Sequence, residues 1–190
     1  MIKNLGSKLS IGILVTTLSI LATLANYIGA DLAGKGGSHT ANARQLLADA
    51  NREDGLAMQL VILDATTFDG FVVYEGKDDD LAGYFYENLS QPLLKSIDRG
   101  DLFDEIYKEE MYAATTELSA KAEDEFAKAD EYYAKQGSLS VITLFAALGL
   151  SFAGYASLLD EENRLRSIFA SIAALALGLI LIQFLRVFIF

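Results

Sequence analysis

Three long apolar segments constrain the fold of this sequence more than any other feature. Leu9–Ala30 and Leu139–Leu159 contain no charged residue, and Ser167–Phe190 contains only Arg186. A helix needs about 20 residues to cross the hydrocarbon core of a bilayer, and each segment reaches that length. The sequence therefore predicts an all-α membrane protein with three transmembrane helices.

The first apolar segment has a second interpretation, a secretory signal peptide. Lys3 and Lys8 precede its apolar core, and small residues end it near Ala30, which is the order found in signal peptides. However, the apolar run is longer than the core of a typical signal peptide. We therefore expect this segment to remain as an uncleaved anchor.

Charge separates the chain into a membrane part and a water-exposed part. The 190 residues carry a net charge of −11, but residues 31–136 alone hold 23 acidic and 10 basic residues. This division predicts a transmembrane anchor over residues 1–30, an acidic helical extramembrane domain over 31–136, and a transmembrane hairpin over 137–190. The acidic surface argues against nucleic acid as a partner. The absence of cysteine excludes disulfides and thiolate metal sites.

Three crossings would place the N-terminus and the short loop 160–166 on the same side of the membrane. That side holds Lys3, Lys8, Arg164 and Arg166, and basic residues in short loops favour the cytoplasm. We expect a multi-pass protein of the cell inner (plasma) membrane whose acidic domain is extracytoplasmic.

One long amphipathic helix is predicted over residues 101–136, which contain neither Gly nor Pro. Its apolar or small residues recur at a mean spacing close to the helical period; they are Phe103, Tyr107, Met111, Ala114, Leu118, Ala122, Phe126, Ala129 and Tyr133. Asp101 can cap its N-terminus. Because only Gly137 and Ser138 precede the second apolar segment, the two can form one helix.

A second apolar stripe predicts another long helix after Gly36-Gly37, returning from the first span. It consists of Ala43, Leu47, Ala50, Ala57, Val61, Ala65, Phe68 and Val72. Residues 68–74 have some strand character. Residues 81–97 suggest shorter helices broken at Pro92. The simplest assembly is a bundle of three or four helices next to the membrane.

Two loop motifs have a possible ligand and a simpler interpretation. Residues 29–36 match the spacing of a phosphate-binding loop, except that Gly36 stands where Ser or Thr should bind magnesium. We interpret them as a flexible hinge at the membrane surface. Asp78-Asp79-Asp80 resembles the start of a calcium loop, but Ala82 and Leu89 occupy two ligand positions. A turn that caps the next helix is the preferred interpretation.

No catalytic, cofactor or metal site is predicted. The acidic residues of the domain have no Glu-x-x-His pattern, because His39 is the only histidine, and dinuclear iron bundles need such pairs. We interpret the acids as a solvated surface. A pH-sensing or cofactor-binding role of His39 stays open as an alternative.

Small residues spaced by four mark the candidate site for helix–helix contact. They are Gly149, Ala153 and Ser157 in the second span and Ala170, Ala174 and Gly178 in the third. Small residues at this spacing let helices approach closely in a membrane. The two faces are expected to contact each other, with an intermolecular partner as the alternative. Beyond them, Arg186 is expected to reach the membrane surface rather than to line an ion pathway.

The layout resembles a family of three-span bacterial membrane proteins known as a domain of unknown function. The resemblance rests on the first span, the Gly-rich residues 34–37, a charged helical middle, residues Glu131-Tyr132-Tyr133-Ala134-Lys135 and the closing hairpin. An aromatic-rich stretch that the family has soon after its first span is absent here. The resemblance implies the three-span topology and no activity.

These patterns predict a non-enzymatic structural or accessory subunit of a membrane protein assembly. Its expected partners are the lipid bilayer and either other membrane protein subunits or further copies of the chain. The first alternative is a sensory or regulatory module with an external helical bundle. The second is an oligomeric channel or transporter component, which the scarcity of charges within the spans disfavours.

Overall fold

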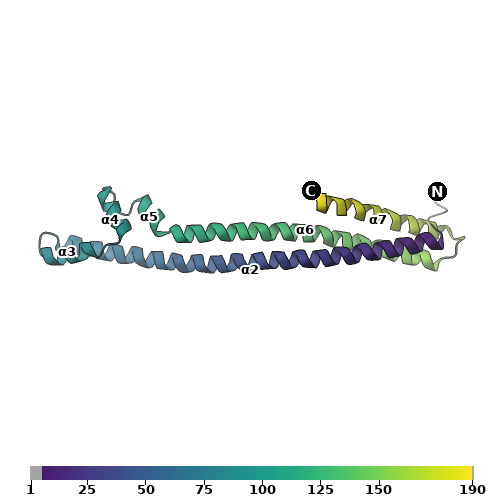
Figure 1. Cartoon of the computed structure of the whole chain (residues 1–190), viewed down its shortest axis with the longest axis horizontal. Coiled ribbons are helices and arrows are strands. Elements are labelled where there is room, and N and C mark those ends of the chain that lie inside the picture. The colour runs from purple at the N-terminus through teal and green to yellow at the C-terminus, as the bar shows by residue number, and fades with distance from the viewer. Residues whose placement is uncertain (1–5, 190) are drawn as a thin grey trace. The chain divides into compact units, whose positions relative to one another are not determined.

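The structure is a computed structural model that describes residues 6–189, and all regular elements within that range are helices (Figure 1). They are α2 (Lys8–Tyr74), α3 (Asp79–Glu87), α4 (Gln91–Asp98), α5 (Glu105–Met111), α6 (Ala113–Leu158) and α7 (Arg164–Ile189). The predicted all-helical fold is confirmed. Three of the helices, α2, α6 and α7, each contain a segment long and apolar enough to cross a membrane.

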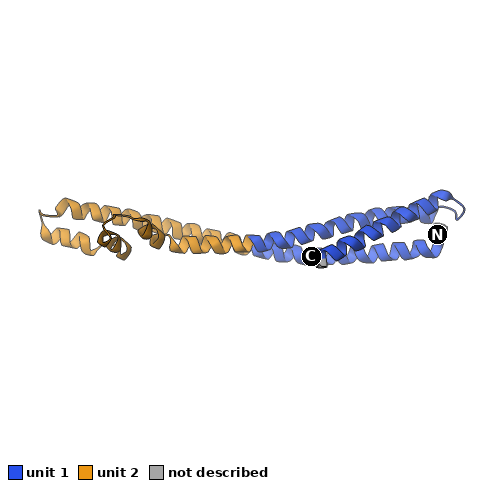
Figure 2. Cartoon of the chain, turned by 90° about the horizontal axis from the view of Figure 1, so that it is seen from above, with its two compact units in different colours: residues 1–39, 127–190 blue, residues 40–126 orange. Residues whose placement is uncertain are grey.

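Packing divides the chain into two compact units (Figure 2). Unit 1 consists of residues 1–39 and 127–190, and unit 2 consists of residues 40–126. These limits follow from contacts, whereas the predicted domains follow from charge. The positions of the membrane surfaces, predicted near residues 30 and 136, therefore stay predictions.

Unit 1 is a bundle of three helices built around aliphatic side chains. Its central cluster takes residues from α2, α6 and α7, namely Leu18, Ala25, Leu139, Ile142, Ala146 and Ile180. Several of the buried residues recur every seven positions, as Ile11, Leu18 and Ala25 do on α2. A repeat of seven keeps one seam of a helix against its neighbours.

Unit 2 has a smaller core, in which the short helices pack on α2. Leu89, Leu93 and Tyr107 are buried there, and Val61 and Phe68 of α2 pack against them. The seven-residue repeat continues on α2 through the buried residues Ala43, Ala50 and Ala57. The repeat thus carries small side chains in this unit, whereas Leu47 and Val72 of the predicted stripe are exposed.

The expected break at Gly36-Gly37 does not exist, because α2 is continuous from Lys8 to Tyr74. Gly costs about 1 kcal/mol relative to Ala inside a helix, but here it provides space. A Cβ on Gly36 would lie 3.0 Å from Cε1 of Tyr133 on α6. Neither the hinge nor a phosphate-binding loop is formed, and residues 68–74 are helical rather than extended.

The helix predicted from Asp101 begins later and has an interruption. Asp104, not Asp101, is the N-cap of α5, where its side chain accepts a hydrogen bond from the backbone N–H of Tyr107. Phe103 has a φ of +58°, which no helix permits at its start. Tyr112 separates α5 from α6. From there α6 runs through Gly137 without a break, as predicted.

The predicted short helices are confirmed, but the interruption lies at residues 88–90 and not at Pro92. Residues 79–98 form two short helices, and Pro92 lies in the first turn of α4, where its missing N–H costs nothing. Ser90 caps α4 by accepting a hydrogen bond from the backbone N–H of Leu93.

Candidate functional site

Three of the six predicted contact residues lie in the core of unit 1. Ala153 is fully buried in a cluster with Leu14 of α2 and Ala173 of α7. Ala170 is buried in another cluster with Ile11 and Ala156. Each cluster therefore joins all three long helices rather than the hairpin alone.

Gly149 makes the closest approach of the six. A Cβ at this position would lie 3.0 Å from Cδ1 of Leu18 and 3.2 Å from Cβ of Ala176. These distances are shorter than most Cβ contacts, so α2 and α7 both approach α6 closely at this glycine, and a larger residue would require its neighbours to shift.

The other three predicted residues lie at the edge or outside of this packing. Ala174 is half-buried beside the Ala153 cluster. Ser157 is exposed, and its hydroxyl donates to the carbonyl of Gly154 in its own helix (2.7 Å). Gly178 is exposed and has no neighbouring atom within 4 Å of its Cβ position. The predicted role of the two faces in assembly stays a prediction.

A buried carboxylate on α2 organises the core of unit 2. Asp64 is 3% exposed. It accepts hydrogen bonds from the backbone N–H of Ser90 (2.9 Å), from the hydroxyl of Ser90 (2.5 Å) and from the hydroxyl of Tyr107 (2.9 Å). Burying a carboxylate is costly unless its oxygens are hydrogen-bonded, and here three donors meet it. Through these hydrogen bonds, Asp64 holds the start of α4 and the side chain of Tyr107 of α5 against α2.

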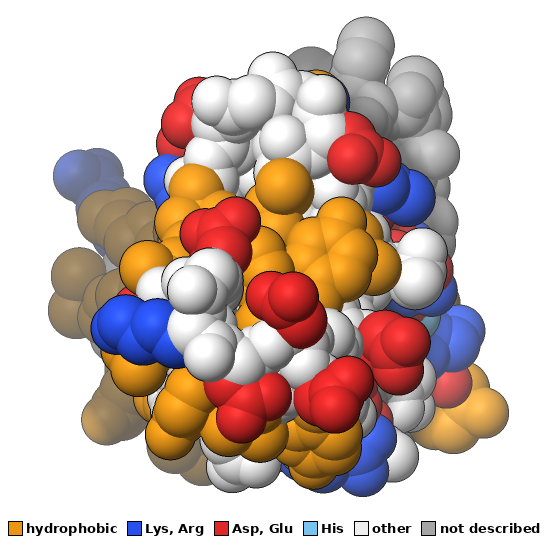
Figure 3. Space-filling model, turned by 90° about the vertical axis from the view of Figure 1, so that its left-hand side faces the viewer, with side chains coloured by type: hydrophobic (Ala, Val, Ile, Leu, Met, Phe, Trp, Pro, Cys, Tyr) orange, Lys and Arg blue, Asp and Glu red, His pale blue; other side chains and the backbone are white. Residues whose placement is uncertain are grey.

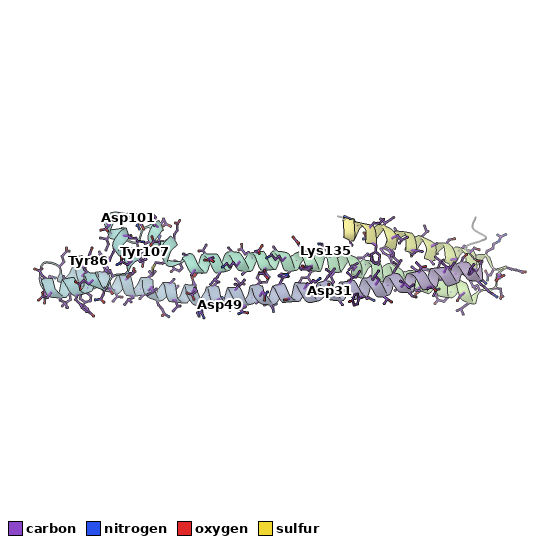
Figure 4. The ribbon with its side chains drawn as sticks, viewed as in Figure 1. Asp31, Asp49, Tyr86, Asp101, Tyr107 and Lys135 are labelled. Carbon is purple, nitrogen blue, oxygen red and sulfur yellow. The ribbon has the colours of Figure 1, made fainter. Side chains whose placement is uncertain are left out.

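Tyr107, labelled on α5 in Figure 4, is the most buried of these donors. Burial raises the pKa of its hydroxyl well above the usual range, and the hydrogen bond to Asp64 raises it further. The hydroxyl therefore keeps its proton at neutral pH and remains a donor.

A second polar cluster closes the loop between α4 and α5. The hydroxyl of Ser96 donates to the carbonyl of Asp101 (2.6 Å) and accepts from the N–H of Asp104 (3.2 Å). Nη2 of Arg99 donates to Oδ1 of Asp104 (2.7 Å), and Nε donates to Oδ2. This guanidinium lowers the pKa of Asp104 to about 2. The bidentate geometry makes the pair specific as well as strong.

Arg166 is the buried cation of unit 1 among the residues described. Arg166 is 3% exposed. Nε donates to the carbonyl of Gly6 (2.6 Å), and Nη1 donates to the carbonyl of Leu159 (2.8 Å). The guanidinium therefore joins the segment before α2 to the loop between α6 and α7.

The remaining motifs have structural explanations. Asp78 is the N-cap of α3 and accepts from the N–H of Leu81 (3.1 Å), which confirms the capping turn. No group of three or more metal-binding side chains is present in the described part of the chain. His39 stacks on Tyr132, with ring centroids 5.4 Å apart and planes inclined by 10°. A sensing role for it remains untested.

Sequence reasoning missed Asp64 and Arg166 as organising residues. A signal for Asp64 was present, because the seven-residue repeat of Ala43, Ala50 and Ala57 reaches Asp64 at its next step. No comparable signal marks Arg166, since its acceptors are backbone carbonyls and Gly6 lies 160 residues away.

Comparison with protein-family models, curated proteins and solved structures finds no match to this chain.

Proposed function

We propose that the protein is a non-enzymatic accessory or structural subunit of an assembly in the cell inner membrane. In this proposal α2, α6 and α7 cross the bilayer, and the acidic domain extends from the extracytoplasmic face. The length and apolar character of the three helices support the crossing. An exposed apolar surface in unit 2 supports the role in assembly.

That surface is a nine-residue segment of α2, residues 55–63, which contains no charged residue. Its exposed large side chains are Leu56, Met58, Leu60, Ile62 and Leu63. Ile62 is 60% exposed and Leu63 is 58% exposed. Each square ångström of apolar surface left in water costs about 25 cal/mol, and clustered exposed apolar groups typically mark interaction sites. The apolar segment is the single observation that carries the proposal.

Residues 55–63 lie too far along α2 to share the bilayer with the first span. Leu56 follows Ala30 by 26 residues of unbroken helix, which is about 39 Å at 1.5 Å per residue. This rise exceeds the roughly 30 Å of the hydrocarbon core. Protein contact is therefore the better way to cover these side chains.

The end of unit 2 that holds α3 is acidic. Where the space-filling view faces this end, hydrophobic side chains lie between Asp and Glu side chains (Figure 3). Such a surface favours a partner that carries basic groups.

A photo-crosslinking residue at Ile62 tests the proposal in native membranes. We expect an adduct from Ile62 and none from a crosslinker at Asp69, which is exposed on the same helix but outside the apolar segment. An adduct of twice the chain mass identifies self-association, and any other mass identifies a different subunit. Equal crosslinking at both sites, or none at either, would contradict the role in assembly.

Cysteine labelling tests the crossing separately, because the chain has no native cysteine. Single cysteines at Ser38 and Asn163, both exposed, should react with an impermeant reagent from opposite sides of the membrane. Labelling of both from one side would refute the three-span topology.

The sensory alternative is favoured by one specific observation, the continuity of α2 and α6. Each helix contains residues of both units without a break, so each of these helices offers a covalent path for a signal from unit 2. A ligand that raises the melting temperature of the full chain in detergent, and no adduct from Ile62, would favour this alternative.

A further inference from the structure

A cleft with polar and apolar lining residues opens between the last turns of α7 and the facing part of α6 in unit 1. Its volume is about 490 Å³, and it is lined by Ala134, Lys135, Ser138, Gln183, Arg186 and Val187. Figure 4 labels Lys135 on α6, near the C-terminal end of α7. Two basic side chains from different helices thus line one cleft.

Neither cation of the cleft has an acidic partner within the described residues. Elsewhere Lys35 pairs with Asp31 at 2.8 Å, and Lys121 pairs with Glu117. By contrast, Lys135 and Arg186 make no ion pair or hydrogen bond with any residue that the structure describes. In a chain with 26 acidic and 15 basic residues, two unpaired cations on one cleft leave a local positive field.

A polar group with free hydrogen-bonding capacity completes the lining. The amide of Gln183 has no partner in the part of the chain that the structure describes. The hydroxyl of Ser138 donates to the carbonyl of Ala134 (3.1 Å), so its oxygen is still able to accept. Together these groups can bind phosphate oxygens and a hydroxyl-bearing headgroup at once.

The cleft also lies at the correct level for a lipid headgroup. Arg186 follows Arg166 by 20 residues of the sequence, about 30 Å of helix, which equals the thickness of the hydrocarbon core. Lys135 precedes the uncharged run that starts at Leu139 by four residues. In the proposed crossing, both cations therefore lie at the membrane boundary on the side of the acidic domain.

We propose that this cleft binds the headgroup of an anionic phospholipid in the leaflet next to the acidic domain. Arg186 holds two phosphate oxygens with its planar guanidinium, and Lys135 supplies the second positive charge. Gln183 donates to the remaining oxygens, while Ala134 and Val187 contact the glycerol and the first methylenes of the acyl chains. The assignment rests on the proposed crossing of the bilayer and adds a selective lipid to it.

The test uses the full chain in nanodiscs that contain equal amounts of phosphatidylglycerol and phosphatidylcholine. After release into the gas phase, native mass spectrometry counts the lipids that stay bound. We expect one retained phosphatidylglycerol on the wild-type protein. Because a basic residue near anionic lipid contributes about 1 kcal/mol, Lys135→Gln and Arg186→Gln should each lower retention about fivefold.

Arg164→Gln is the matched control, because Arg164 is exposed at the opposite end of α7. It should retain phosphatidylglycerol as the wild type does. Equal loss in all three variants would show a general charge effect and overturn the site. Equal retention of both lipids by the wild type would also overturn it, even if a cleft variant failed to fold.

Two further outcomes separate the possible failures. Displacement of the retained lipid by inorganic phosphate alone would show an anion site without lipid specificity and would overturn the proposal. Failure of the protein to enter nanodiscs would contradict the crossing itself. Entry without phosphatidylglycerol selectivity would contradict the lipid site and leave the crossing intact.

Discussion

The two units use the same kind of helix but fasten it by different physical means. In unit 1, aliphatic residues and small residues such as Ala153 and Gly149 bring three helices together. In unit 2, the large side chains of the core are few, and Asp64 holds α4 and α5 on α2 through hydrogen bonds. Close packing of side chains therefore determines how the helices of unit 1 are arranged, and hydrogen-bond geometry determines much of the arrangement in unit 2.

This difference fits the surroundings proposed for each unit. Lipid removes the hydrophobic incentive between helices, so a membrane bundle depends on close packing of small residues. A water-exposed domain of modest size has little apolar surface to bury, and satisfied polar groups give its short helices a unique position. The comparison leads to four predictions.

The largest effect is expected from Asp64→Ala in unit 2. The change leaves the buried hydroxyl of Tyr107 and the partly buried donors of Ser90 without an acceptor, and a buried donor without a partner costs about 1–3 kcal/mol. We expect a loss of at least about 3 kcal/mol in the free energy of unfolding, measured by chemical denaturation of the full chain in detergent. Asp69→Ala, on the exposed side of the same helix, should change stability by less than about 0.5 kcal/mol. Similar losses in both variants would refute the organising role of Asp64.

Overpacking should be the most damaging change in unit 1. Ala153→Leu adds three carbons where Leu14 and Ala173 already touch, and such insertions cost about 1–3 kcal/mol. Ser157→Leu, one turn later on the exposed face, should leave the stability nearly unchanged. Unfolding by a denaturing detergent measures both variants. Unchanged stability of Ala153→Leu would show that this packing does not limit the stability of unit 1.

Acid should weaken unit 2 through the pair of Arg99 and Asp104. The pKa of Asp104 falls from 3.8 to about 2 in the folded chain, because the guanidinium donates to its carboxylate. The group therefore stabilises the fold fully above about pH 4 and loses this contribution as the pH falls toward 2.

The melting temperature of the wild type should accordingly fall more steeply over that interval than that of Asp104→Asn. Parallel curves for the two proteins would show that the pair does not contribute to stability.

The smallest effect on stability is expected from replacing either of two glycines of α2 by alanine. Gly34 has open space around its Cβ position, so Gly34→Ala should stabilise α2 by about 1 kcal/mol. Gly36→Ala should not gain this amount, because its Cβ would meet the ring of Tyr133. Thermal melting compares the two variants. An equal gain in both would mean that the close contact at Gly36 adjusts without cost.

The sequence predicted the parts of the fold that depend on periodicity and composition. The apolar segments, the helical middle and the capping role of Asp78 follow from patterns within a few residues. The continuity of α2 did not follow, because Gly36 is unfavourable by propensity alone and is explained only by Tyr133.

Long-range polar contacts explain the other misses. The donors to Asp64 lie 26 and 43 residues away in the chain, so no local pattern pairs them. Likewise, the late start of α5 depends on how Ser96, Arg99 and Asp104 close their loop. For the candidate contact residues, spacing identified Ala153 and Ala170 equally with the exposed Gly178, because spacing does not say which face of a helix is covered.

The contact between Arg166 and Gly6 constrains the order in which contacts form during translation. The carbonyl of Gly6 can accept the hydrogen bond only after 160 further residues, up to Arg166, have been synthesised. All of unit 2 is translated within that interval, since it lies between the two parts of unit 1. The middle of the chain therefore has its complete set of partners earlier than the two ends, whose contacts through α7 form only after unit 2 has been synthesised.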